Sequence, residues 1–327
     1  MYEWQLPRIV TFNNLISFYE ANKIKGLTCF HVQGSFGDVY LQLSHLNLRA
    51  SQVNAPFAVL IDPHYFNLAR KAIPPNVMVI AVQSPVLNML LTNLGLLGKG
   101  EGLFPTRLLP TLYPLIAELI TKGSLHYTSF LEFLMDIEPV DRLPSIESEV
   151  DQAWAHNYLE ALGLPVGSSI LICADNNSQK EFSAEFWDRV IEVSRRLGLT
   201  PCLNDSGSTG KTQSRVVTRS DITRIKVDPD KAISIVSSCG FYVGGTNGFI
   251  GIQSIFNFTA KGINFINAIG SDGKDIIDLG GEYVPMRAFY YERMYPKHFL
   301  QNTIERPIHD ETDLSFIEST FKELISL

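Results

Sequence analysis

The fold is decided by residues 27–46, LTCFHVQGSFGDVYLQLSHL, where a short apolar run leads through a glycine turn into a helical pattern. Residues 27–33 have the length and apolar character of a buried strand. From Val39 onward, apolar residues recur at spacings of three and four, which is the period of an amphipathic helix. Gly34 and Gly37 lie between the two, where glycine permits a tight turn and a close approach of the backbone to a ligand. The stretch therefore predicts a strand–turn–helix unit.

Similar units recur along the rest of the chain. Further apolar runs of strand length are found at 56–62, 77–82, 169–175, 199–205, 222–227, 240–245 and 262–268. Helical patterns lie between most of them, at 183–197, 230–239 and 248–257. Strands that alternate with helices indicate βαβ units and a parallel sheet that is buried on both faces. We therefore predict an α/β fold, in which functional loops follow the carboxyl ends of the strands.

The length of 327 residues corresponds to about two domains of roughly 150 residues each. Residues 136–147, DIEPVDRLPSIE, are acidic, contain two prolines and lack periodicity, which is typical of a linker. We therefore predict a first Rossmann-like domain at 1–147 and a second at 148–309. Residues 310–327 carry apolar residues at helical spacing and predict a final amphipathic helix.

Composition excludes several classes of protein. The net charge of −7 lacks the basic footprint of a sequence-independent nucleic-acid binder. The first ten residues, MYEWQLPRIV, do not have the basic and then apolar pattern of a signal peptide, and no apolar run reaches the 18 residues of a membrane span. The four cysteines show no C-x-x-C spacing, so a zinc or thioredoxin-like site is not indicated. We expect a cytoplasmic protein with no nucleic-acid partner.

The run HVQGSFGDVYLQLSHLNLRA, residues 31–50, resembles the start of the heptosyltransferase-type glycosyltransferases of the GT-B fold. Residues 111–137 are similar to the late first domain of that family, and 169–205 to the opening of its second domain. Residues 232–256 resemble the stretch that holds the family's Asp-Thr-Gly or Asp-Ser-Gly. The resemblance covers roughly residues 27–260 at low identity. It implies two Rossmann-like domains that face a cleft, with the C-terminal helix returning to the first domain.

The resemblance implies that the first domain binds the acceptor and the second binds the nucleotide-sugar donor. In the family, the Asp of the Gly-Asp pair deprotonates the acceptor hydroxyl, which implies this role for Asp38. The residues that we expect on the acceptor side are Ser35, Phe36, Gly37 and His64. Taken by itself, the sequence leaves two interpretations of Asp38 open, an N-cap of the following helix or a general base at the mouth of a cleft.

On the donor side, a nucleoside diphosphate must leave, so its developing charge has to be stabilised. A helix that begins near Gly248 would direct free amide groups at a phosphate, and Lys180 would supply a counter-charge. The candidate donor-binding residues are Asn176, Asn177, Ser178 and Lys180 in one loop, Gly244, Gly245, Thr246, Asn247 and Gly248 in another, and Lys211 as a further phosphate contact. The alternative interpretations are a strand exit with an N-cap and a solvated surface lysine.

The sequence departs from the family pattern in the second of these loops. Thr246 stands where the family has the Asp of Asp-Thr-Gly. Ile250 and Gly251 stand where it has its Ser-x-x-His region. These departures leave open the donor sugar, the nucleotide base and whether the site still uses a donor.

The resemblance thus implies an inverting, metal-independent glycosyltransferase. It would move a sugar from a nucleotide sugar to a hydroxyl of a glycan or glycolipid, in the synthesis of bacterial surface polysaccharide or lipopolysaccharide. We expect no metal and no cofactor besides the donor substrate. Two alternatives stay open, which are a nucleotide-sugar epimerase of the same fold and a non-catalytic nucleotide-sugar-binding relative.

Residues 84–121 contain more leucine than two amphipathic helices need. Lys99, Arg107 and Lys122 lie in or beside this region. Such a surface is typical of a protein that associates peripherally with the inner face of a membrane or binds a lipid-linked acceptor. Simple packing in the core of the first domain is the alternative interpretation.

Overall fold

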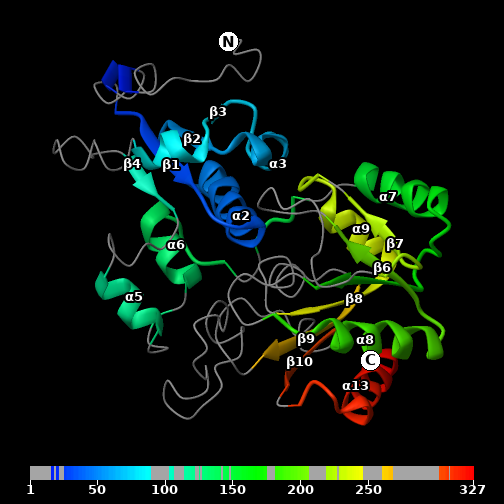
Figure 1. Ribbon diagram of the computed structural model, residues 1–327. Coiled ribbons are helices and arrows are strands. Elements are labelled where there is room, and N and C mark those ends of the chain that lie inside the picture. Colours follow the sequence, from blue (N-terminus) through cyan, green and yellow to red (C-terminus); the bar gives the residue numbers. More distant parts are fainter. Residues whose placement is uncertain are drawn as a thin grey trace. The chain divides into compact units, whose positions relative to one another are not determined.

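The computed structural model divides into two compact units, Met1–Ile146 and Glu147–Leu327. Each unit is built on an all-parallel sheet with helices packed against it (Figure 1). The structure describes residues 16–17, 20–21, 26–89, 103–106, 114–121, 125, 127–140, 143–146, 149–174, 181–205, 219–226, 228–245, 260–267, 302–308 and 310–327.

The first unit contains a four-stranded sheet with the order β3-β2-β1-β4. Its strands are β1 (Thr28–Val32), β2 (Phe57–Ile61), β3 (Met78–Ala81) and β4 (Leu103–Pro105). Its described helices are α2 (Phe36–Gln52), the 3-10 turn η1 (Pro63–Tyr65), α3 (Phe66–Ala72), α5 (Pro114–Thr121) and α6 (Tyr127–Met135). The three strands that the sequence predicts in this unit are confirmed, whereas β4 is an additional strand.

Helix α2 is buried much more completely than an amphipathic helix. The predicted apolar stripe is present, since Val39, Leu43 and Leu46 are each at most 1% exposed. Gln42 and His45 are also fully buried, although both are polar. A buried polar side chain is costly unless it is hydrogen-bonded. His45 Nδ1 lies 2.8 Å from Leu41 O, and Gln42 is hydrogen-bonded to Gln33 and Thr106 inside the unit.

The second unit contains a six-stranded sheet with the order β10-β9-β8-β5-β6-β7. Its strands are β5 (Ser169–Cys173), β6 (Thr200–Asn204), β7 (Thr223–Ile225), β8 (Gly240–Gly245), β9 (Lys261–Asn267) and β10 (Thr303–Ile308). Its described helices are α7 (Glu149–Ala161), α8 (Ala184–Arg196), α9 (Ala232–Cys239) and α13 (Leu314–Ser326). The strand β10 is not predicted by the sequence pattern, and the predicted helix at 248–257 lies outside the described residues.

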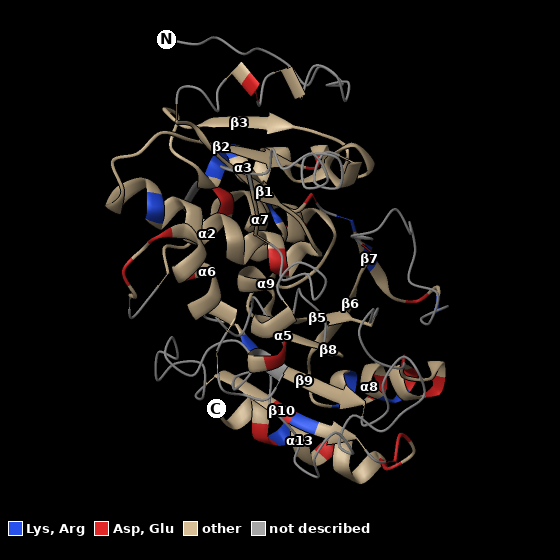
Figure 2. Cartoon of the chain, turned by 90° about the vertical axis from the view of Figure 1, so that its left-hand side faces the viewer, with Lys and Arg blue, Asp and Glu red and all other residues tan. Residues whose placement is uncertain are grey.

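Two apolar layers cover the faces of this sheet. Ile170 and Ile172 of β5 pack with α8 and α13 on one face, while Leu171 and Cys173 pack with α7 and α9 on the other. Successive residues of a strand point to opposite faces, so β5 is buried on both sides, as its unbroken apolar sequence predicts. Figure 2 shows residues of both charge signs on α8 and α13.

The C-terminal helix α13 packs in the core of the second unit. Ile317, Phe321 and Leu324 of α13 are at most 1% exposed and belong to the apolar layer of the second unit. The helix packs on α8, β9 and β10. Its buried stripe therefore covers the β9–β10 end of the second sheet, and the return of the helix to the first domain stays a prediction. It begins later than residue 310, because the Asp313 carboxylate caps it by accepting a hydrogen bond from Phe316 N at 3.0 Å.

Candidate functional site

The strand order locates a candidate site in each unit. When the six strands of the second sheet are numbered by their order in the chain and read from the β7 edge, they follow the order 3-2-1-4-5-6, which is the Rossmann arrangement. The four strands of the first sheet, read from the β3 edge, follow the corresponding order 3-2-1-4. The order reverses between β5 and β8 in the second unit and between β1 and β4 in the first. Ligands of open α/β sheets bind at the carboxyl ends of the strands at such a reversal. The predicted catalytic and donor segments begin at these two places.

Asp38 lies at the carboxyl end of β1, in the first turn of α2. Its Oδ2 atom accepts hydrogen bonds from Ser35 N at 3.0 Å and from Ser35 Oγ at 2.9 Å. Gly34 has a φ of +128°, and a Cβ atom at this position would lie 2.6 Å from Asp38 Oδ2. The turn therefore requires glycine both for its backbone angle and for the space that the carboxylate occupies.

The two interpretations of Asp38, a helix cap and a general base, concern different oxygen atoms of its carboxylate. Oδ2 is used to cap the helix through Ser35, as in the return arm of a capping box. Oδ1 accepts no hydrogen bond from the residues that the structure describes, and the side chain is partly exposed. One oxygen thus orients the group while the other is available to accept a proton.

A second carboxylate, Asp62, follows β2 at the same edge of the sheet. Asp62 Oδ1 accepts a hydrogen bond from His64 N at 2.9 Å, and Oδ2 accepts from Ser84 N at 3.2 Å and Ser84 Oγ at 2.7 Å. Tyr65 is 5% exposed, and its hydroxyl has no hydrogen-bond partner in the described part of the chain. Burial raises the pKa of the Tyr65 phenol well above its usual range, and the charges of Asp62 and Asp38 raise it further.

The other predicted acceptor-side residues fall into two groups. Ser35 contacts Asp38 directly, and Gly37 is buried beside it in the first turn of α2. Phe36 is 5% exposed with its ring centroid 6.0 Å from that of Tyr40, so its side chain packs inside the unit. His64 is exposed and its ring lies against the Tyr65 ring, with the centroids 4.8 Å apart.

The sequence pattern did not single out a buried polar network behind Asp38. Gln42 Oε1 accepts hydrogen bonds from Gln33 N at 3.2 Å and from Thr106 Oγ1, and Gln42 Nε2 donates to Gln33 O at 2.8 Å. Thr106 N and Oγ1 both donate to His31 O at 3.0 Å. The network ties the ends of β1 and β4 to α2. Its sequence signal is a glutamine between two leucines within the buried stripe of a helix.

His31 belongs to this network as a neutral, buried side chain. Its Nε2 atom lies 2.7 Å from Gln33 Nε2, and burial lowers its pKa to about 3. The imidazole therefore accepts a hydrogen bond from the Gln33 amide and does not titrate in the physiological range. His31 is therefore a buried core histidine that takes part in the network by accepting a hydrogen bond.

In the second unit, the topology brings the two predicted donor segments to neighbouring strands. The strands β5 and β8 pair in parallel, with Cys173 opposite Gly244, and end at the same edge. Gly244 and Gly245 are buried at the end of β8. The remaining candidates lie outside the described residues; they are Asn176, Asn177, Ser178, Lys180, Lys211, Thr246, Asn247 and Gly248.

The end of β6 adds one carboxylate that the sequence pattern did not assign to the donor side. Asp205 is 8% exposed and directly follows β6. Its Oδ1 atom lies 3.4 Å from Arg224 Nη1 of β7. The described part of the donor edge therefore carries a glycine pair at the strand reversal and a paired acid two strands away.

The fold is that of the heptosyltransferase-type GT-B glycosyltransferases. E. coli ADP-heptose lipopolysaccharide heptosyltransferase II matches with a TM-score of 0.58 and 12% identity, over 91% of this chain and 98% of that one. E. coli heptosyltransferase WaaC with ADP matches with a TM-score of 0.53 and 11% identity, over 91% of this chain and 99% of that one. A family 9 glycosyltransferase from Veillonella parvula matches with a TM-score of 0.54 and 12% identity, over 91% of this chain and 89% of that one.

Sequence comparisons give no closer relative. No protein-family model matches the chain, and no curated protein matches its sequence. The likeness is therefore one of fold, and it confirms the resemblance that the sequence indicates at that level. Among the helices within the described ranges, none has the length and apolarity that a bilayer span requires.

Proposed function

We propose that this chain is a glycosyltransferase that moves a sugar from a nucleotide-sugar donor to a hydroxyl of a glycan or glycolipid. The observation that carries the proposal is Asp38, at the strand reversal of the first unit in a heptosyltransferase-type fold. Ser35 fixes one carboxylate oxygen, and the other, which accepts no hydrogen bond from the described residues, would receive the acceptor hydroxyl. An oriented carboxylate with a free oxygen is the arrangement that a general base requires.

The proposed reaction is an inverting displacement. Asp38 Oδ1 takes the proton of the acceptor hydroxyl as its oxygen attacks the anomeric carbon of the donor. The bond from that carbon to the nucleoside diphosphate breaks on the opposite face, so the configuration inverts. Free amides of a helix N-terminus and Lys180 would offset the charge of the departing diphosphate without a metal ion.

Two named neighbours suggest the first donors to test. One is an ADP-heptose heptosyltransferase, and another was solved with ADP. We therefore propose an ADP-linked sugar as the leading donor. By the same argument, lipopolysaccharide or another bacterial surface polysaccharide is the leading acceptor class.

The proposal is tested by incubating the protein with a panel of nucleotide sugars, with and without candidate glycan acceptors. Nucleoside diphosphate release and the mass of the recovered donor are followed, with and without EDTA. We expect acceptor-dependent release that EDTA does not change. The Asp38→Asn variant keeps a side-chain oxygen for Ser35 but lacks the base, so we expect loss of transfer with donor binding retained.

The other outcomes separate the alternatives. Transfer by Asp38→Asn at the wild-type rate would remove the central assignment. Isomerisation of the donor without an acceptor would indicate an epimerase. Donor binding without any turnover would indicate a non-catalytic relative, for which the departure at Thr246 is the supporting observation.

We also propose that the first unit contacts a membrane surface from the cytoplasmic side. Large apolar side chains are exposed on two of its helices, with Leu115 of α5 at 66% and Phe133 of α6 at 80%. Leu87, in contrast, is fully buried, so part of the leucine-rich region is core. Residues 90–102 and 107–113 of that region lie outside the described residues.

Vesicle co-sedimentation tests this surface. We expect the wild-type protein to sediment with anionic vesicles, because exposed apolar side chains insert at the headgroup boundary. A Leu115→Ser, Phe133→Ser double variant should sediment less. Val166→Ser in the second unit, at a position 38% exposed, serves as the matched control. Absence of wild-type binding would contradict the membrane proposal.

A further inference from the structure

Gln42 is the most completely buried amide side chain near Asp38. It lies on α2 one helical turn after Asp38 and has no exposed surface. A buried amide without partners would be strongly destabilising. Its oxygen accepts two hydrogen bonds and its nitrogen donates one, so the burial is compensated by specific contacts.

Two of these hydrogen bonds hold the backbone of Gln33, in the turn that leads to Asp38. Gln42 binds both the N–H and the C=O of Gln33, in the way that a neighbouring strand binds a residue in a sheet. Gly34 alone separates Gln33 from Ser35, whose N–H and hydroxyl hold Asp38 Oδ2. The turn is therefore fastened to α2 at two points one helical turn apart, by Gln42 and by Asp38.

The third contact of Gln42 joins the Gln42–Gln33 clamp, meaning the two hydrogen bonds between these residues, to the segment that follows β4. Thr106, directly after β4, donates through its hydroxyl to Gln42 Oε1 and to His31 O. Tyr127 Oη of α6 donates to the Thr106 carbonyl at 3.1 Å. Because β4 lies across the strand reversal from the β1 turn, these bonds fix the two sides of the candidate site relative to each other.

We propose that Gln42 is a positioning residue for Asp38 in the transfer reaction. It fixes the turn at residues 33–35 so that Ser35 holds one carboxylate oxygen and the other faces the acceptor hydroxyl. This inference rests on the proposed function of Asp38. Gln42 acts through the turn and touches neither substrate.

The chain offers a matched control on the same helix. Gln52, in the last turn of α2, also bridges the N–H and C=O of one residue, with Glu138 N donating to Oε1 at 2.9 Å and Nε2 donating to Glu138 O at 3.4 Å. Gln42→Glu and Gln52→Glu therefore make the same chemical change to the same kind of clamp. Only the first clamp is connected to Asp38.

The first readout is hydrogen exchange of the Ser35 amide, which reports directly on its bond to Asp38. We expect Gln42→Glu to accelerate this exchange tenfold or more and Gln52→Glu to leave it unchanged. Thr106→Val is the second variant, because it removes the hydroxyl that contacts Gln42 Oε1 and His31 O and keeps the side-chain volume. It should give a smaller acceleration. Wild-type exchange at Ser35 in both Gln42→Glu and Thr106→Val would overturn the proposal.

The second readout is the kinetics of nucleoside diphosphate release with the donor and acceptor found in the panel. A misplaced base lowers kcat by about 100-fold and leaves the donor KM unchanged. As the pH falls, a protonated Glu at position 42 regains a donor for Gln33 O, so the activity of Gln42→Glu relative to wild type should rise. A wild-type kcat in this variant, with transfer lost in Asp38→Asn, would overturn the positioning role alone. If Asp38→Asn retains transfer, the assignment of Asp38 as the base fails, and if no nucleotide sugar gives transfer with the wild-type protein, the proposed function fails; in both cases the exchange experiment still decides whether Gln42 fixes the turn.

Discussion

Gly34 meets two requirements at once, a left-handed backbone angle and space for the Asp38 carboxylate. Its φ of +128° is a conformation that residues with a Cβ atom rarely adopt. The position of its missing Cβ is also filled by the Asp38 carboxyl group. Any side chain at position 34 would therefore strain the backbone and displace the Asp38 carboxylate.

Gly34→Ala tests this double requirement. We expect a loss of roughly 1–3 kcal/mol in the free energy of unfolding from backbone strain, together with a fall in transfer activity. Gly26→Ala is the matched control, because Gly26 has a φ of +70° and nothing within 4 Å of the added Cβ. Thermal unfolding and the diphosphate-release assay should show strain in both variants but lost activity only in Gly34→Ala. Equal activity in the two would show that Asp38 is not held by this turn.

At the scale of elements, the sequence predicts every central strand of both sheets but only two of the four edge strands, β3 and β7. β1, β2 and β5 are predominantly apolar, because each is buried on both faces. β4 and β10 were missed, and both are edge strands. β4 is only three residues long, and β10 (TIERPI) contains Thr, Glu, Arg and Pro, which an edge position tolerates.

The residues of the candidate site also divide into those that the local sequence pattern predicts and those that it does not. Asp38 could be predicted because a Gly-Asp pair follows a strand directly. Gln42 and Thr106 could not, because their contact depends on the pairing of β1 with β4, which is distant in sequence. Local pattern thus locates the base, and only the tertiary structure shows what orients it.

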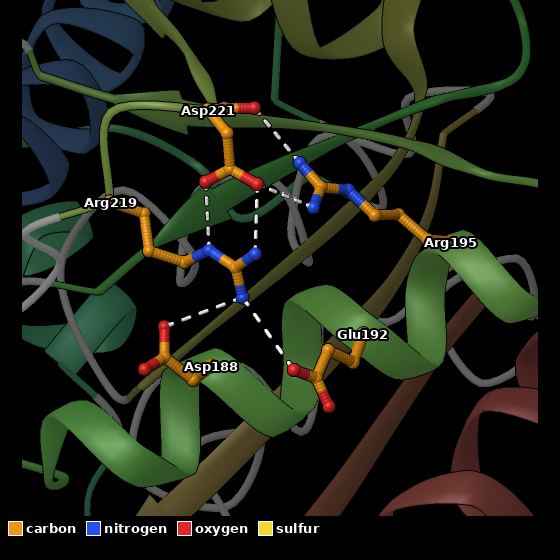
Figure 3. Close-up of polar contacts among 5 residues, drawn as sticks. All are labelled: Asp188, Glu192, Arg195, Arg219 and Asp221. Carbon is orange, nitrogen blue, oxygen red and sulfur yellow. Dashed lines mark hydrogen bonds and ion pairs between the residues drawn. The ribbon is translucent and has the colours of Figure 1, made fainter.

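The edge strand β7 is fastened to α8 by a charged network (Figure 3). Asp221, just before β7, accepts hydrogen bonds from Arg219 at 2.9 and 2.8 Å and from Arg195 of α8 at 2.7 Å. Arg219 also lies 3.8 Å from Asp188 and from Glu192. These hydrogen bonds from Arg219 and Arg195 hold the pKa of the Asp221 carboxyl well below its usual range.

The network predicts a pH-dependent contribution to stability. A carboxyl whose pKa is lowered by folding stabilises the protein at pH values above its unfolded pKa and loses this effect as the pH falls through the folded value. Asp221→Asn should therefore lower the denaturant midpoint at pH 7, and the difference from wild type should shrink below about pH 4. Because the charges are exposed, 1 M salt should shrink it as well. A difference that is the same at pH 7 and pH 3 would contradict an ionic origin.

At the scale of the whole molecule, each unit has its own sheet and its own apolar layers. The second unit also contains α13, which supplies Ile317, Phe321 and Leu324 to the layer beside α8. A unit that buries its own core folds independently as a rule. The heptosyltransferase-type fold of the chain would then consist of two separable folding units, with the proposed donor site contained in one of them.

This arrangement predicts the behaviour of two fragments. Residues 147–327 should unfold in one cooperative transition and bind ADP, if the donor site is complete in this unit. Residues 147–309, which lack α13, should not fold, because three buried side chains at about 1.5–3 kcal/mol each approach the total stability of a domain. Circular dichroism during urea unfolding distinguishes the two. If the shorter fragment unfolds as cooperatively as the longer one, α13 is dispensable to the second unit. The helix would then not be part of the core that this unit needs in order to fold.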